Sequence, residues 1–211
     1  MPTLAAFSFA DLFARGGVVM YPLLALSVLA VTLILERTFF FLTTNSPLRR
    51  ERIYQLGKLL RAGDLEDAKR QAARDRSVYG DAVSRILDEP VSESAGVDAI
   101  EAQRGRLERF LPMLSTIITA APMLGILGTV IGIIGAFGQL ELSGSRADLD
   151  LNQLGGDIGE ALITTAAGIT VALVTLFPYN LFRAQADRSL SRLESLVAAA
   201  LSKNADSAKD S

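Results

Sequence analysis

The chain has 211 residues, half of them hydrophobic, and a formal net charge of only −2. It contains neither Cys nor His, which excludes a disulfide framework, a thiolate metal site and the usual near-neutral proton shuttle. No basic patch suggests nucleic acid, and we expect neither a metal nor a cofactor. The charged residues are distributed very unevenly, which indicates an all-α membrane protein with soluble parts.

Three stretches contain no Asp, Glu, Lys or Arg: Gly16 to Leu35, Phe110 to Leu140, and Ala161 to Phe182. A helix needs about 20 apolar residues to cross roughly 30 Å of hydrocarbon. The sequence therefore predicts transmembrane helices over residues 16–42, 110–140 and 158–182. We expect the first run to be retained rather than cleaved as a signal peptide, because a single basic residue precedes it and no small-residue cleavage site follows.

Residues 43–109 show amphipathic helical patterning and are predicted to form a cytoplasmic helical domain. Gly63 followed by Asp64 predicts a helix stop and a new N-cap. A longer helix is expected to start near Val97 and to run unbroken into the second span.

Residues 183–211 are predicted to form a cytoplasmic C-terminal helix and tail. Leu190, Leu193 and Val197 recur there at heptad-like intervals. Two interpretations stay open for this face, namely a contact between subunits and packing on the cytoplasmic domain.

Lys and Arg indicate the orientation, because cytoplasmic loops hold the excess of basic residues. Residues 43–109 hold 13 of the 21 basic residues, and the tail from Arg183 holds five more. The N-terminal segment, residues 1–15, and the loop over residues 141–157 hold one Arg each. Both are predicted to be periplasmic, with the C-terminus in the cytoplasm.

Small residues form a stripe along the second span, in the pattern that lets membrane helices approach closely. The third span has a comparable stripe of small residues around Gly168. Two interpretations stay open for these stripes, namely contact within one chain only and contact between chains. The residues predicted to serve helix packing are Gly125, Gly128, Gly132, Gly135 and Gly168.

Glu160 stands at the head of the third run, followed within two turns by Thr164 and Thr165. A carboxylate at membrane depth is costly unless it is protonated, paired or hydrated, so it indicates an ion path. The alternative for Glu160 is an acid at a helix N-terminus, stabilised by the helix dipole in headgroup water. Thr129, Thr164 and Thr165 either line the path or bond to the carbonyl one turn back.

Three segments carry a resemblance to the MotA/TolQ/ExbB proton channel family, closest to its ExbB and TolQ branch. They read GGVVMYPLLALSVLAVTLILER from Gly16, APMLGILGTVIGIIGAF from Ala121 and IGEALITTAAGITVALVTLFPYNLF from Ile158. In the third segment the chain has Val174 where branch members usually carry a proline, and its own proline is Pro178.

The resemblance implies that Glu160, Thr165 and Thr129 line the proton path, with Thr164 adjacent. It also implies a pentameric ring around a dimer of single-span, ExbD- or TolR-like partners that carry an intramembrane Asp. Such complexes use the proton-motive force of a bacterial inner membrane to act on a TonB- or TolA-like envelope protein.

The expected function is therefore a subunit of an energy-transducing complex and not an enzyme. The rival interpretation is a nonconducting membrane scaffold in which the glycine stripes serve assembly. A secondary transporter is disfavoured because three spans without an internal repeat provide no pair of half-sites. Na⁺ in place of H⁺ stays open, since a carboxylate and hydroxyls can coordinate either ion.

Overall fold

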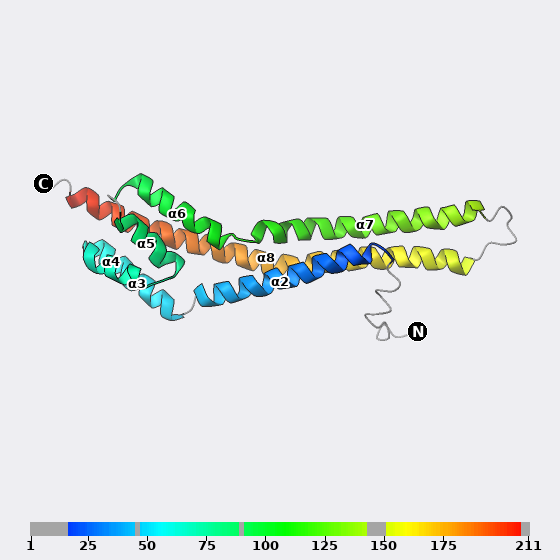
Figure 1. Ribbon diagram of the computed structural model, residues 1–211, viewed down its shortest axis with the longest axis horizontal. Helices are drawn as coiled ribbons and strands as arrows, with labels where there is room; N and C mark the ends of the chain where they lie inside the picture. The colour runs from blue at the N-terminus through cyan, green and yellow to red at the C-terminus, as the bar shows by residue number, and fades with distance from the viewer. Residues whose placement is uncertain (1–16, 45–46, 89–90, 143–150, 208–211) are drawn as a thin grey trace. The chain divides into compact units, whose positions relative to one another are not determined.

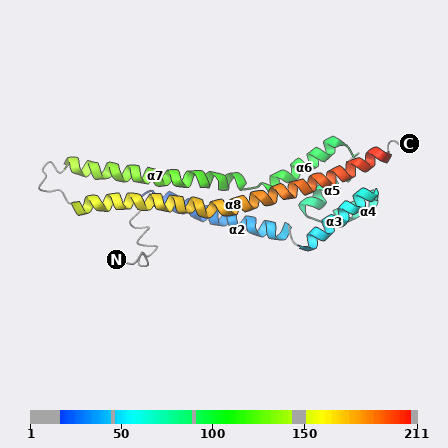
Figure 2. The same ribbon diagram turned by 180° about the vertical axis from the view of Figure 1, so that it is seen from behind.

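The computed structural model describes residues 17–44, 47–88, 91–142 and 151–207, and every regular element in those ranges is an α-helix (Figures 1 and 2). The chain divides into two compact units. The first unit comprises Met1–Ile34 and Met113–Tyr179, and the second comprises Leu35–Pro112 and Asn180–Ser211.

Three helices are long and apolar enough to cross a membrane: α2 (Met20–Thr44), α7 (Leu111–Leu142) and α8 (Leu151–Ser207). Their apolar stretches cover Met20–Thr44, Leu111–Gly138 and part of Ala161–Ser202. The shortest of these has 25 residues, which at about 1.5 Å per residue exceeds the thickness of the hydrocarbon layer. The prediction of three membrane-spanning helices is confirmed by length and composition.

The first unit is built from α2, α7 and the N-terminal half of α8, and both ribbon views show α7 alongside that half of α8 (Figures 1 and 2). Among the described residues, one cluster of its core is formed by Val19, Met20, Leu23 and Ala121. Only 22–28% of each apolar stretch is buried within the chain. Most apolar side chains of the spans therefore face outward, as expected where lipid or other chains cover them.

The second unit contains four shorter helices: α3 (Pro47–Ala62), α4 (Leu65–Ala73), α5 (Val78–Asp88) and α6 (Glu93–Leu107). Gly63 ends α3 with a φ of 84°, a conformation that glycine adopts without strain. The Asp64 side chain then accepts the amide of Asp67 as the N-cap of α4. The predicted stop and cap at these two residues are confirmed.

The C-terminal half of α8 packs on these shorter helices. Leu190, Leu193 and Val197 are buried within the chain. A Cβ added to Gly96 of α6 would lie 2.6 Å from Val197 Cγ1, so the two helices are in close contact. The face that the sequence left open between two interpretations is occupied by the chain's own helices.

Two boundaries differ from the predictions. The helix expected to run unbroken into the second span is interrupted, because α6 ends at Leu107 and α7 begins at Leu111. Phe110 between them has a φ of 68°, which no α-helix contains. In addition, α8 begins at Leu151 and includes part of the loop predicted over residues 141–157.

Candidate functional site

The contact between α7 and α8 is close enough to exclude side chains at three glycines. A Cβ added to Gly125 would lie 2.9 Å from Thr165 Cα, and one added to Gly128 would lie 2.6 Å from Thr164 Oγ1. A Cβ on Gly168 would overlap the Ala121 carbonyl oxygen. The small side chains thus bring two helix backbones into direct contact, as in other close-packed membrane helices.

The other two glycines of the stripe lie elsewhere. Gly132 is half-buried, and Gly135 is exposed with no atom of the described residues within 4 Å of where its Cβ would be. Within the described part of the chain, the contact therefore covers the end of the stripe near Gly125 and Gly128.

Thr165 bonds across this contact. Its hydroxyl donates to the Gly125 carbonyl oxygen at 2.9 Å, joining residues 40 positions apart. Helical geometry directs the amide of Thr129 to the same carbonyl, because an α-helix pairs each C=O with the N–H four residues later. Two of the predicted path residues therefore meet at one carbonyl oxygen.

Thr164 and Thr129 bond within their own helices. The Thr164 hydroxyl is buried against Gly128 and donates to the Ala161 carbonyl at 2.7 Å. The Thr129 hydroxyl donates to the Ile126 carbonyl at 2.6 Å from a half-buried position. A hydroxyl has one proton to donate and two lone pairs. The hydroxyls of Thr165 and Thr129 each donate to a carbonyl and therefore keep acceptor capacity for a proton donor or a cation.

Glu160 belongs to α8 and precedes Thr164 by four residues, about one helical turn. The side chain of Glu160 lies outside the described part of the structure. Among the described residues, no group of three Asp, Glu, His or Cys side chains could hold a metal ion.

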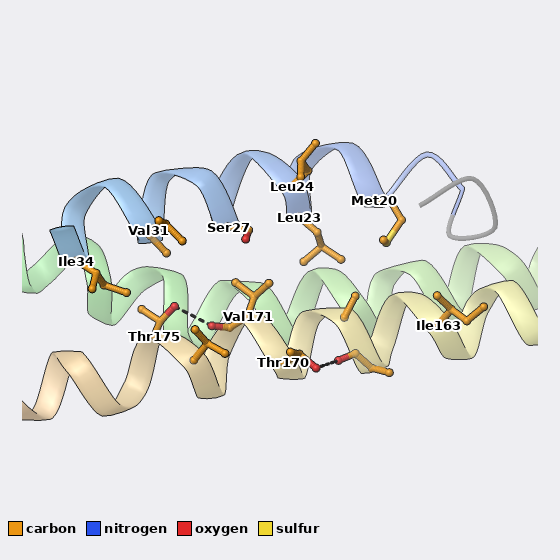
Figure 3. Close-up of a pocket in the computed structure, with 14 residues that line it drawn as sticks. Met20, Leu23, Leu24, Ser27, Val31, Ile34, Ile163, Thr170, Val171 and Thr175 are labelled. Atoms are coloured by element: carbon orange, nitrogen blue, oxygen red, sulfur yellow. Dashed lines mark hydrogen bonds between the residues drawn. The ribbon is translucent and has the colours of Figure 1, made fainter. Parts of the chain in front are cut away.

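An apolar groove between α2 and α8 is a feature that the sequence patterns did not indicate (Figure 3). It has a volume of about 490 Å³ and is lined mainly by aliphatic side chains. Thr170 and Thr175 also line it, and their hydroxyls donate to the carbonyls of Ala166 and Val171. Because these two hydroxyls are already bonded to their own helix, the groove resembles hydrocarbon more than a polar channel.

A second unanticipated feature is Arg37, which the sequence places at the charged end of the first span. Its side chain is only 1% exposed, and it hydrogen-bonds to the end of another helix, α6. The sequence offers one signal for this, the Glu36–Arg37 pair directly before a cluster of phenylalanines. The burial of Arg37 is visible only in the structure.

Comparison with known proteins agrees with this architecture. The model of the MotA/TolQ/ExbB proton channel family matches residues 75–195, from just before α5 to the C-terminal part of α8. The putative biopolymer transport protein ExbB-like 1 of Synechocystis is 34% identical over 174 residues, which cover 81% of this chain and 68% of that protein.

Two further relatives are similar over shorter lengths. The biopolymer transport protein ExbB of Xanthomonas campestris is 34% identical over 55% of this chain and 46% of its own length. The Tol-Pal system protein TolQ of Pseudomonas aeruginosa is 34% identical over 44% of this chain and 39% of its own length. From the family match and these likenesses, the chain belongs to the MotA/TolQ/ExbB proton channel family.

Proposed function

We propose that this chain is an ExbB- or TolQ-like subunit of a complex that couples inward proton flow to mechanical work in a bacterial inner membrane. Several copies, five by family resemblance, form a ring around a dimer of single-span partners. Those partners are ExbD- or TolR-like and carry an Asp within the membrane. The powered component is an envelope protein of the TonB or TolA kind.

The observation that carries this proposal is the hydrogen bond that the Thr165 hydroxyl donates across the α7–α8 contact. Thr165 and the Thr129 backbone share the Gly125 carbonyl, and Glu160 lies one helical turn before Thr164. The three apolar runs contain no Lys or Arg to neutralise an acid. A carboxylate there is stabilised by a proton, by a cation or by a residue of another chain.

Each residue has a defined role in this mechanism. Glu160 accepts a proton at the outer end of the path, and the lone pairs of the Thr165 and Thr129 hydroxyls accept hydrogen bonds as the proton moves inward. Thr164 holds α8 against Gly128, which keeps Thr165 within reach of Gly125. Neutralising the partner's Asp weakens its electrostatic hold on the ring and lets the inner dimer move.

The membrane supplies the driving force, at roughly 2.3 kcal/mol per unit charge per 100 mV of potential. Inward flow from Glu160 requires that the N-terminal end of α8 faces the periplasm. The second unit, which is rich in Lys and Arg, then faces the cytoplasm. This is the orientation that the excess of Lys and Arg favours.

The test is proton flux into liposomes that contain the chain together with its single-span partner. We expect flux with the wild-type chain, a large loss with Glu160→Gln and a smaller loss with Thr165→Val, all at unchanged assembly. Thr170→Val is the matched control, because Thr170 is also on α8 but donates to its own helix and is exposed. Full flux in Glu160→Gln would refute the proposed path.

The same assay separates the rival functions. A nonconducting scaffold passes no protons in any variant, although the ring assembles. A sodium-driven version passes charge only when Na⁺ is present, so flux measured with and without sodium identifies the ion.

A further inference from the structure

The turn between α6 and α7 contains a strained residue. Among the described residues, Phe110 is the one non-glycine position with a positive φ, at 68°. In that conformation the Cβ of a bulky residue crowds its own backbone, so the turn persists only where its surroundings hold it. The chain passes through this turn to enter α7, the helix that carries Thr129.

Arg37 of α2 provides the contacts that hold the turn. Its Nη1 donates to the carbonyl oxygens of Arg106 at 3.1 Å and Leu107 at 3.4 Å, the last two residues of α6. The last carbonyls of a helix have no partner in their own helix and carry the negative end of its dipole. A guanidinium from another helix therefore completes the C-terminus of α6.

The remaining donors of Arg37 are paired with its neighbour. Nε and Nη2 bind the two carboxylate oxygens of Glu36 at 2.6 and 3.0 Å, a bidentate pair. A buried charge that lost these partners would be strongly unfavourable. The fork geometry thus keeps Arg37 in one orientation, with Nη1 aimed at α6.

Aromatic rings enclose the guanidinium. Its Cζ lies 4.6 Å from the ring centroid of Phe40 and 5.3 Å from that of Phe110. Both distances lie within the range of cation–π attraction. Arg37 therefore contacts the strained residue itself as well as the carbonyls that precede it.

We propose that Arg37 is a positioning residue that holds the α6–α7 turn and thereby fixes how the chain enters the helix carrying Thr129. The effect of Arg37 on proton flow rests on the proposed function. Its stabilisation of the α6–α7 turn does not depend on that function. Lys cannot replace it, because a single ammonium does not match both the Glu36 carboxylate and the α6 carbonyls in a fixed fork.

The first experiment measures hydrogen–deuterium exchange in peptides covering residues 105–113 of the full chain in detergent. We expect Arg37→Gln to speed exchange by about tenfold or more, because a buried carbonyl loses its donor. Arg37→Lys should give a smaller increase. The matched control is Arg109→Gln, since Arg109 also lies over the Phe110 ring, at 4.6 Å, but is exposed; it should leave the rate within about twofold.

A second variant tests the role of strain. Glycine adopts the φ of residue 110 without cost, so Arg37→Gln combined with Phe110→Gly should exchange more slowly than Arg37→Gln alone. This comparison also covers the case in which Arg37→Gln folds poorly. Equal exchange in the wild type, Arg37→Gln and Arg109→Gln would overturn the hold on the turn.

Proton flux per assembled complex tests the positioning role. Arg37→Gln should lower this flux while the shape of its pH profile stays that of the wild type, because the proton-binding groups are unaltered. Wild-type flux in Arg37→Gln, or a shifted pH profile, would overturn positioning through the turn. If the wild-type complex itself passes no protons, the proposed function fails and the exchange measurement still tests the turn.

Discussion

Gly128→Ala is expected to separate α7 from α8. The added methyl would lie 2.6 Å from Thr164 Oγ1 and 2.9 Å from Thr164 Cβ, up to about 0.9 Å closer than the lower end of the favourable contact range. Rotating the Thr164 side chain moves Oγ1 away but breaks its hydrogen bond to Ala161 and leaves Cβ in place. The backbones must therefore move apart.

The expected cost is that of overpacking a well-packed contact, about 1–3 kcal/mol. For a chain of this size that corresponds to a fall of about 2–12 °C in the midpoint of thermal unfolding. Gly135→Ala is the matched control, because nothing lies within 4 Å of its Cβ position. It should leave the midpoint unchanged or raise it slightly, since alanine favours helix over glycine by about 1 kcal/mol.

Thermal unfolding of the purified chain in one detergent measures both variants. A double variant, Gly128→Ala with Thr164→Ala, should lose less than the two single losses added together, because it removes the oxygen and methyl that the new side chain meets. Proton flux with the partner should fall in Gly128→Ala, since separation also pulls Thr165 from Gly125. Equal midpoints for Gly128→Ala and Gly135→Ala would refute the close contact.

Three further variants test other parts of the structure. Thr165→Val removes the hydrogen bond to the Gly125 carbonyl, and should lower stability by about 1 kcal/mol in thermal unfolding. Tyr79→Phe should be neutral or stabilising in the same assay, because the Tyr79 hydroxyl is buried and has no hydrogen-bond partner among the described residues; a loss above about 1 kcal/mol would contradict this. Ser92→Ala removes the cap of α6, whose hydroxyl accepts the Ala95 amide, and should cost about 1 kcal/mol, visible as faster hydrogen exchange in the first turn of α6.

The membrane spans were predictable because they are recognised by their apolar composition. This composition does not depend on how the helices pack. The same holds for the start of α4, where Gly63 and Asp64 act through local backbone chemistry alone. Such features need no knowledge of distant residues. They account for the helical character of the fold and for the boundary between α3 and α4.

The α6–α7 turn was not predictable from local pattern. Phe110 has no intrinsic preference for a positive φ. Its ring is contacted by Arg37, which lies 73 residues earlier in the chain. The burial of Arg37 was not predictable for the same reason. Long-range contacts determine the backbone conformation of Phe110 and the burial of Arg37. A single sequence does not show such contacts.

At the candidate site the residue types were predictable from the sequence, but the directions of their side chains were not. Thr164 and Thr165 are adjacent, and a helix separates them by about 100°. One hydroxyl therefore stays with its own helix while the other crosses to α7. Which of the two crosses depends on the rotation of α8 against α7, and the glycines set that rotation.

The outward-facing apolar surface of the spans predicts how proton flux depends on the density of subunits in the membrane. A single chain buries only a small part of the apolar surface of its spans. Under the proposed function, assembled rings therefore conduct protons and single chains do not. Diluting a fixed amount of protein into more lipid should then reduce flux more steeply than in proportion, because rings dissociate as chains become sparse. Membranes with half the subunit density would carry less than half the current.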